Sequence, residues 1–287
     1  MLLALLALVG AADLTLTWWR YRGPIAALAS GTPATTAYMR RELTTHGPQQ
    51  PVVWTALDDV SPVAVCAVLA AEDWGFFRHG SLDWDSQRRM FTKLLHADLS
   101  AGGSTIAQQL ARNLFLGPDR TPRRKAREYV LAYMLSQAVP KARQLELYLN
   151  LVEWGPGVWG IGAASRHWFG KLPNELTPTE AVLLATILPA PRRGLAYAGT
   201  LAARRAQQGA LYWLWYATLL DNIGRSATSG RLRLWGIYVA AGRDPIEARA
   251  RVEQVFGPEP AADGAAQARR RAVAARCAGG GRRGEEP

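Results

Sequence analysis

Apolar residues recur at helical spacing along most of this chain, and that periodicity constrains the fold more than any other feature. Such a pattern predicts helices that each bury one face against a core. Glycine or proline separates the segments, and runs of alternating apolar and polar residues are scarce. We therefore predict a mainly helical globular domain, with helices at residues 61–72, 104–116, 122–138, 141–152, 160–168, 177–188 and 202–222.

The composition is typical of a folded domain, but the charge distribution does not decide which class of ligand the domain binds. The 287 residues are 49% hydrophobic and include 11 tryptophans, which is ample for a core. The formal net charge is +11, and between residues 112 and 143 eight basic residues stand against two acidic ones. Such a cluster suits nucleic acid, an anionic membrane surface or a phosphorylated substrate. After residue 242 the composition turns to Ala, Gly, Arg and Glu, so we expect the last ~30 residues to be disordered.

The first 19 residues are mainly Leu, Ala, Val and Trp, and they predict a transmembrane anchor. Aromatic and basic residues stand at its end, where an interfacial belt would lie: Trp18, Trp19, Arg20, Tyr21 and Arg22. Asp13 lies inside the apolar stretch, and the arginines favour a cytoplasmic location for the chain that follows them. A cleaved signal peptide is the alternative, but the basic residues that open such peptides are missing. Residues 20–50 are expected to connect the anchor to the domain.

The sequence gives little indication that the protein uses cysteine thiols or a zinc ion. Cys66 lies in an apolar helical segment and Cys277 in the tail, so we predict two free thiols. His79 has no second histidine or cysteine at ligand spacing, so no zinc site is predicted.

A candidate binding helix occupies the stretch GGSTIAQQLARNLFL, residues 102–116. Ile106, Leu110 and Leu114 form one apolar stripe, and polar residues line the other faces. Thr105 and Gln108 fit a capping box, and the preceding glycines permit close approach of an anion to the helix start. The polar rows are either a solvated face or the wall of a binding cleft.

Two glutamates lie where periodicity places a carboxylate beside apolar residues. Glu72 ends the apolar face of its helix, where burial and the helix dipole favour the neutral acid and suit it to general-base catalysis. Glu128 lies on an apolar stripe one turn after Arg124 and Lys125, whose positive charges are expected to favour the charged carboxylate. In enzymes that act on glycosidic bonds, two carboxylates in different environments take different roles, one in proton transfer and one as a fixed charge. The alternatives are a solvated helix end for Glu72 and a surface ion pair for Glu128.

Five segments in order are more specific than any single residue. They are AAEDWGFFRHGSLDW, GGSTIAQQLARNLFL, RTPRRKAREYVLAYMLSQ, KARQLELYLNLVEWGPGVWGIGAASRHWFGK and LTPTEAVLLATILPAP. In sequence and spacing they resemble the peptidoglycan glycosyltransferases, or transglycosylases, of bacterial cell-wall synthesis, over about residues 50–195. Because no transpeptidase domain fits in the chain after them, the sequence resembles the monofunctional biosynthetic form.

The resemblance implies a lysozyme-like, two-lobed helical domain, here at residues 51–225, followed by a C-terminal extension at 226–287. It implies polymerisation of lipid II with release of undecaprenyl diphosphate. Glu72, in the motif Glu-Asp-x-x-Phe-x-x-His, matches the base that deprotonates the acceptor 4-hydroxyl, and Glu128 matches a second carboxylate near the donor diphosphate. The implied substrate-binding positions are Asp73, Ser104, Gln109, Arg112, Asn113, Arg120, Arg124 and Lys125.

The sequence departs from the family pattern in several places. Ser81 stands where the family has glycine after the motif histidine, Arg112 replaces the usual lysine, and Gln144 stands where isoleucine is common. None of these changes removes a proposed catalytic group, although arginine alters the hydrogen-bond geometry.

The implied partners are lipid II, the growing glycan chain, the membrane and other wall-synthesis proteins, but not nucleic acid. The implied location is the bacterial inner membrane, with a single span and the catalytic domain on the periplasmic side. A divalent cation, Mg²⁺ or Mn²⁺, is a candidate cofactor at the diphosphate, although the sequence shows no metal cage. Two other functions stay open. One is a lysozyme-like lytic enzyme, which has no need of the cation cluster, and the other is an inactive membrane scaffold, against which both glutamates argue.

Overall fold

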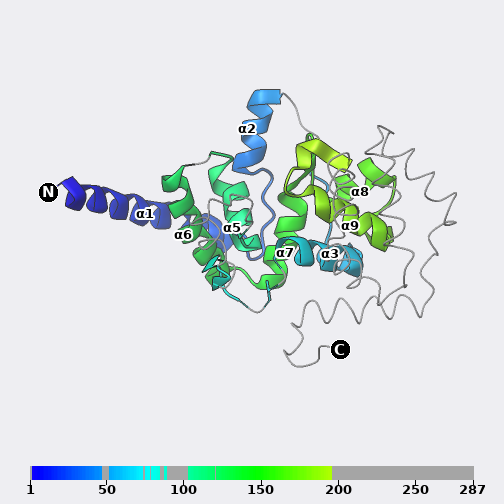
Figure 1. The fold of residues 1–287 in the computed structure, drawn as a ribbon, viewed down its shortest axis with the longest axis horizontal. Coiled ribbons are helices and arrows are strands. Elements are labelled where there is room, and N and C mark those ends of the chain that lie inside the picture. Colours follow the sequence, from blue (N-terminus) through cyan, green and yellow to red (C-terminus); the bar gives the residue numbers. More distant parts are fainter. Residues whose placement is uncertain are drawn as a thin grey trace. The chain divides into compact units, whose positions relative to one another are not determined.

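The structure, a computed structural model, describes residues 2–46, 52–73, 75–77, 79–84, 87–88, 103–119 and 121–195. Helices dominate this part of the chain (Figure 1), so the prediction of a mainly helical fold is confirmed. The chain divides into two compact units, unit 1 with Met1–Val52 and Gly75–Val152, and unit 2 with Val53–Trp74 and Glu153–Pro287. The helix predicted at 202–222 and the tail lie outside the described residues, and the likeness to lysozyme stays a prediction.

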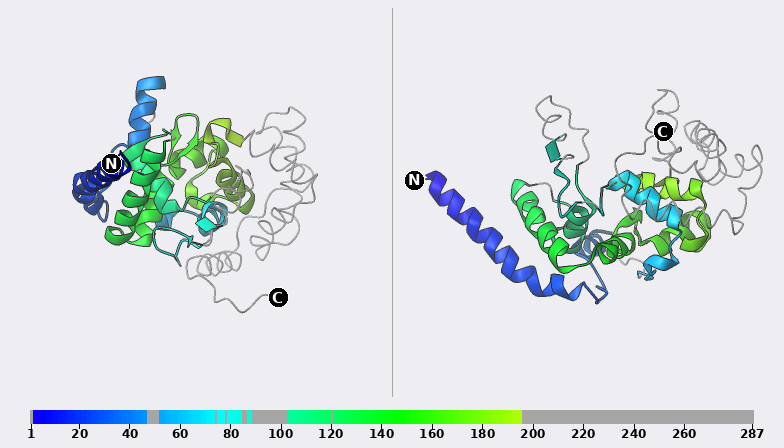
Figure 2. Two further views of the ribbon diagram at one scale, coloured as in Figure 1. Left: turned by 60° about the vertical axis from the view of Figure 1, so that its left-hand side comes forward. Right: turned by 90° about the horizontal axis from the view of Figure 1, so that it is seen from below.

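The described secondary-structure elements of unit 1 are all helical. Its elements are α1 (Leu2–Ala27), α2 (Ala37–His46), α5 (Ile106–Ala111), the π-helical turn η2 (Arg112–Leu116), α6 (Pro122–Ala138) and α7 (Lys141–Leu151). Helix α1 runs alongside α6, and α5 packs against α6 and α7 (Figure 2). The predicted stripe of Ile106, Leu110 and Leu114 is buried, which explains why α5 lies at the centre of this packing.

The helix predicted at residues 104–116 is interrupted. Helix α5 ends at Ala111, and η2 continues it as one π-helical turn. Gly117 closes that turn with φ of 78°, and its backbone N–H donates to the Arg112 carbonyl at 2.9 Å. Glycine adopts this left-handed conformation without steric cost. Single π-helical turns inside α-helices occur frequently at functional sites, and apolar periodicity does not reveal them.

Helix α1 is continuous from Leu2 to Ala27 and crosses the boundary predicted after residue 19. Ile25, and Leu28 just beyond the helix, are buried in unit 1. Among the described residues, no helix combines the length and apolar character that crossing a membrane requires. The span at residues 1–19 therefore stays a prediction.

The described part of unit 2 contains three α-helices, three short 3-10 helices and a hairpin. Its elements are η1 (Leu57–Asp59), α3 (Pro62–Glu72), β1 (Glu153–Gly155), β2 (Val158–Trp159), α8 (Ile161–Phe169), η3 (Pro173–Glu175), α9 (Pro178–Ile187) and η4 (Pro191–Arg193). Helices α3 and α9 pack side by side (Figure 1). The antiparallel hairpin, with Glu153 opposite Trp159, was not predicted, because its strands are too short to show alternation.

Helix α3 occupies the predicted residues, but two of its details differ from expectation. Ser61 stands at the N-cap position, yet its hydroxyl donates to the Leu176 carbonyl at 3.2 Å instead of capping the helix. Cys66 is buried as its apolar position predicts, but it is disulfide-bonded, so the predicted free thiol is wrong. Helical periodicity predicts burial and carries no information about a covalent partner. Cys277 lies outside the described residues.

Candidate functional site

The N-terminus of α5 is closed by the predicted capping box. Thr105 Oγ1 accepts the backbone N–H of Gln108 at 3.2 Å, and Gln108 Oε1 accepts the backbone N–H of Thr105 at 2.9 Å. The Thr105 hydroxyl also donates to the Ser81 carbonyl at 2.7 Å. Gln108 is fully buried, so its place in the sequence motif is explained by the helix start. Gly102 lies outside the described residues.

The polar row of α5 is engaged with the rest of unit 1. Gln109 donates through Nε2 to the Ser104 carbonyl at 3.4 Å, and its Oε1 accepts the Tyr148 hydroxyl at 3.1 Å. Asn113 is buried, and its Nδ2 donates to the Gln109 carbonyl at 2.8 Å. These bonds fix both amide side chains in position, and their contact with substrate stays a prediction.

Arg112 opens the π-helical turn η2. Its backbone N–H bonds to the carbonyls of Gln108 and Gln109, and its own carbonyl accepts the Gly117 N–H in the i−5 bond that defines the π-helical turn. Its buried Nε has no hydrogen-bond partner among the described residues. A buried guanidinium N–H without a partner is costly, and such a group is suited to a ligand that would accept its hydrogen bond. Arg120, the next predicted cation, lies outside the described residues.

A buried carboxylate stands between two cations at the start of α6. Thr121 Oγ1 caps the helix by accepting the backbone N–H of Arg124 at 3.1 Å. Arg124 donates to Oε2 of Glu128, and Lys125 Nζ donates to Oε1 at 2.5 Å. Lys125 also donates to the Ser104 hydroxyl at 3.2 Å. The structure thus brings Ser104, Arg124, Lys125 and Glu128 into one group, which we call the α6 cluster.

The charges of the α6 cluster do not cancel. The Glu128 side chain is only 3% exposed, whereas Arg124 and Lys125 are 15% and 31% exposed. Glu128 is therefore not the surface ion pair that was the alternative. A carboxylate is buried at tolerable cost when its partners satisfy both oxygens, as they do here. One carboxylate between two cations leaves excess positive charge on the side chains that reach solvent, and that is where an anionic ligand would bind.

Sequence analysis missed two residues that support the α6 cluster, Tyr129 and Gln87. The Tyr129 hydroxyl donates to Gln87 Oε1 at 3.0 Å, and Gln87 Nε2 donates to the Gly103 carbonyl at 2.7 Å. Lys125 Nζ lies 5.0 Å from the centroid of the Tyr129 ring, a cation–π distance. Burial raises the pKa of the Tyr129 phenol, and the neighbouring Glu128 carboxylate adds to the rise. The spacing of Lys125 and Tyr129, one helical turn apart, was the signal available in the sequence.

Glu72 and Asp73 belong to unit 2, at the C-terminal end of α3. Glu72 is the last residue of the helix and is half-buried. Asp73 follows it as the C-cap residue and is buried, with its backbone N–H bonded to the Leu69 carbonyl at 2.9 Å. Glu72 is thus more buried than a solvated helix end and lies at the negative end of the helix dipole, as predicted.

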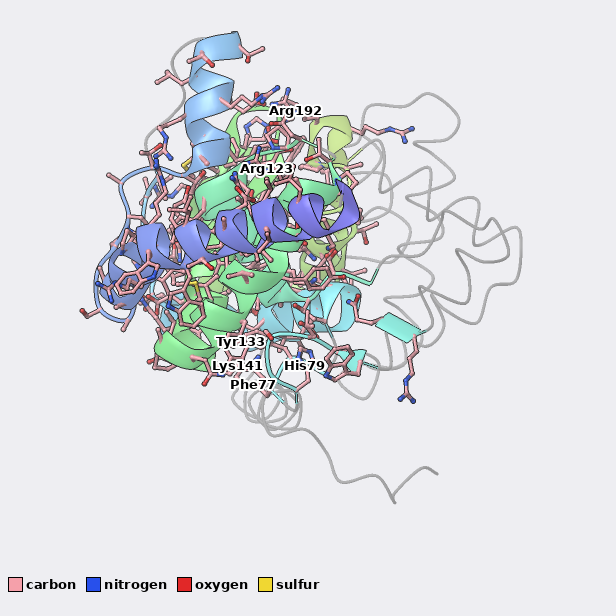
Figure 3. The ribbon with its side chains drawn as sticks, turned by 90° about the vertical axis from the view of Figure 1, so that its left-hand side faces the viewer. Phe77, His79, Arg123, Tyr133, Lys141 and Arg192 are labelled. Atoms are coloured by element: carbon pink, nitrogen blue, oxygen red, sulfur yellow. The ribbon has the colours of Figure 1, made fainter. Side chains whose placement is uncertain are left out.

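The second half of the Glu72 motif lies in unit 1. Phe76 is fully buried, and Lys141 Nζ lies 4.3 Å from the centroid of its ring. Lys141 also donates to the Gly80 carbonyl at 2.8 Å. Figure 3 shows Lys141 next to Phe77 and His79. Because Lys141 is the first residue of α7, these contacts fix the loop to that helix.

Comparison with known proteins identifies the family. The family model described as Transglycosylase matches residues 40–212, more than half of the chain. This chain belongs to the transglycosylase family. The resemblance inferred from the five sequence segments is therefore confirmed, and it extends beyond residues 50–195 on both sides.

Three relatives, each called biosynthetic peptidoglycan transglycosylase, show how far the similarity extends. The protein of Herminiimonas arsenicoxydans is 38% identical over 197 residues, which cover 65% of this chain and 81% of the relative. That of Azoarcus sp. (strain BH72) is 41% identical over 182 residues, 61% of this chain and 75% of the relative. That of Janthinobacterium sp. (strain Marseille) is 36% identical over 212 residues, 69% of this chain and 88% of the relative.

Gln144, a departure from the family pattern, has a structural role in this chain. The side chain is fully buried, and Nε2 donates to the Val139 carbonyl at 2.7 Å and to the Leu135 carbonyl at 3.4 Å. The Val139 carbonyl follows the last turn of α6, where helical carbonyls lack partners within the helix, whereas the Leu135 carbonyl also accepts the Val139 N–H at 2.9 Å. The glutamine thus closes α6, which an isoleucine at this position would not do.

The described residues do not form a metal cage. Among them, no group of three His, Cys, Asp or Glu side chains is arranged to hold a metal ion. Both oxygens of Glu128 already bind cationic side chains, and that environment does not fit a further cation. We derive no step of the chemistry through a metal ion.

Proposed function

We propose that this transglycosylase polymerises lipid II into glycan strands and releases undecaprenyl diphosphate. The observation that carries the proposal is the α6 cluster, because its excess positive charge matches a diphosphate leaving group. The family and the names of the relatives support the same reaction.

In the proposed reaction, the acceptor 4-hydroxyl oxygen attacks the anomeric carbon of the donor sugar. A new carbon–oxygen bond forms there while the bond from that carbon to the diphosphate oxygen breaks, so the configuration inverts. Glu72 takes the hydroxyl proton, and undecaprenyl diphosphate carries away the electron pair of the broken bond. Glu72 is a half-buried carboxylate at the C-terminal end of α3, a position that suits a carboxylate to accept a proton.

The α6 cluster would stabilise the charge that develops on the departing diphosphate. Arg124 and Lys125 are already held by Glu128, so they need not reorganise when that charge appears. Arg112 would add its unpaired Nε–H from η2. The proposed substrate-binding set also includes Asp73, Ser104, Gln109, Asn113 and Arg120, which the family resemblance assigns.

The two alternative functions are not favoured. A lytic enzyme that hydrolyses finished glycan meets no diphosphate, so it would have no use for the excess charge of the α6 cluster. The relatives are named for biosynthesis. An inactive scaffold would have no need of Glu72 or Glu128, and this chain has both.

We propose further that α1 holds the enzyme at the bacterial inner membrane, where the polyprenyl chain of lipid II resides, with the domain on the periplasmic side. Exposed apolar side chains on α1 support this: Leu5, Leu8, Val9, Leu16, Trp18 and Trp19. A reporter that is active only in the periplasm, fused after residue 287, should be active. Activity of a cytoplasm-only reporter at that position would contradict the topology and make Arg20 and Arg22 the orienting charges.

Labelled lipid II distinguishes the three functions. Detergent-solubilised full-length protein should convert it into a ladder of glycan products on a gel. Release of fragments from purified cell-wall sacculi, without a ladder, would indicate the lytic enzyme. Absence of both products from a folded protein would indicate the scaffold.

A further inference from the structure

Asp13 is an acidic residue inside the apolar helix α1, and its carboxylate is bound by two arginines of α6. Arg127 donates to it through Nε at 2.8 Å and through a second guanidinium nitrogen, so both carboxylate oxygens are engaged. Arg123 donates to Oδ1 at 2.6 Å, and Figure 3 shows Arg123 beside α1. The Asp13 side chain is only 11% exposed. This fork-like pairing of arginine with a carboxylate fixes orientation as well as distance.

The four cations in the first turns of α6 are thereby divided between two carboxylates. Arg123 and Arg127 are four residues apart, lie on one face of the helix and bind Asp13 of α1. Arg124 and Lys125 lie on the neighbouring faces and bind Glu128 of α6 itself. Arg123 and Arg127 adjoin Arg124 and Glu128 in the sequence, so without Asp13 the charge of both arginines would be added beside the α6 cluster.

Further contacts hold α1 in the register that places Asp13 against α6. The Trp18 ring lies 6.3 Å from the Tyr133 ring of α6, and the Tyr21 ring lies 4.9 Å from the Phe115 ring of η2. At the C-terminal end of α1, Arg143 of α7 donates to the carbonyls that follow the helix, at 3.2 Å to residue 28 and 2.7 Å to residue 31. The second half of α1 is therefore part of unit 1 and positions α6 and η2 directly.

We propose that Asp13 is a positioning residue for glycosyl transfer, which holds Arg123 and Arg127 against α1 so that Arg124 and Lys125 receive the donor diphosphate. This proposal rests on the proposed function. Without Asp13, two additional cations would compete for the diphosphate. The donor would then bind at least as tightly as before, but with its anomeric carbon displaced from the acceptor hydroxyl.

The test is Asp13→Asn in the full-length enzyme, assayed with lipid II and with inorganic pyrophosphate as an inhibitor. We expect kcat to fall by about 10- to 100-fold, because even a small displacement of the reacting groups slows the reaction. The KM for lipid II should stay unchanged or fall, and pyrophosphate should inhibit at a lower concentration. A purely structural role would lower the amount of active enzyme without strengthening pyrophosphate inhibition. The matched control is Asp119→Asn, which removes the same charge from an exposed pair with Arg41 and should keep the parent kcat.

Two further variants keep the proposal testable if Asp13→Asn does not fold. Asp13→Glu retains the charge and should retain most of kcat. The variant with Asp13, Arg123 and Arg127 all replaced by leucine removes the competing cations and should recover kcat. A folded Asp13→Asn enzyme with the parent kcat and parent pyrophosphate inhibition would overturn the proposal, as would a folded leucine variant that stays inactive. Failure of the parent enzyme to polymerise lipid II would instead overturn the proposed function.

Discussion

Replacing Glu128 by glutamine is the sharpest test of the α6 cluster, because it removes one negative charge from between two cations. Glutamine keeps one acceptor oxygen, so one hydrogen bond from Arg124 or Lys125 survives, while the amide NH₂ meets the other cation. A charge-assisted hydrogen bond contributes about 1.5–3 kcal/mol, and removing one partner of a buried ion pair costs about 3–5 kcal/mol. Arg124 and Lys125 are 15% and 31% exposed, so water relieves part of this cost. We expect the free energy of unfolding to fall by about 2–3 kcal/mol.

Thermal unfolding and lipid II turnover together measure this effect. The Tm of Glu128→Gln should fall by roughly 4–12 °C, and kcat/KM for lipid II should fall by about 100-fold or more, because the two cations no longer hold their positions. The double variant Glu128→Gln/Lys125→Met should regain most of the stability and none of the activity. A Glu128→Gln enzyme with the parent Tm and the parent rate would refute the assignment of the α6 cluster to the diphosphate.

Two other substitutions separate base catalysis from donor binding. Glu72→Gln should reduce turnover by about 10²- to 10⁴-fold, as expected for loss of a general base. Its Tm should hold, since neutralising a carboxylate at a helix C-terminus removes an unfavourable interaction with the dipole. Polymerisation at the parent rate by folded Glu72→Gln would exclude it as the base. Lys125→Met should lower kcat/KM for lipid II by about 10- to 100-fold, the equivalent of one charge-assisted bond. Arg41 is exposed, so Arg41→Gln should change kcat/KM for lipid II little. If Lys125→Met and Arg41→Gln lowered kcat/KM equally, only the overall charge of the protein would matter.

Helical periodicity predicted those parts of the fold that a single apolar face determines. The stripe of Ile106, Leu110 and Leu114 is buried, and the capping box of Thr105 and Gln108 is formed with both of its hydrogen bonds. The same reasoning placed Glu128 beside buried leucines, and it is buried. In each case the deciding interaction lies within one helix or between that helix and the core, so the local sequence contains the information.

The features that the sequence did not reveal depend on contacts between distant segments. Gln87 reaches Tyr129 from a separate segment, and no spacing in the sequence relates the two. Helical periodicity likewise did not predict the disulfide bond of Cys66. Asp13 differs, because a charged residue inside an apolar helix is itself a signal that a partner exists. The sequence showed Asp13 inside an apolar stretch, but its partners on α6 became visible only in the structure.

Burial of a carboxylate does not by itself mark a functional site in this chain. Glu180 is buried, and it accepts the backbone N–H of Thr177 at 2.9 Å in a capping box at the start of α9. Glu153 is also buried, and it accepts the backbone N–H of Gly157 at 3.2 Å across the hairpin turn. Both carboxylates also pair with a cation, Glu180 with Lys171 at 3.0 Å and Glu153 with Arg192 at 3.5 Å, but their backbone bonds fix local structure. Glu128 lies between two cations that reach solvent, and the positive charge left over is what a leaving diphosphate requires.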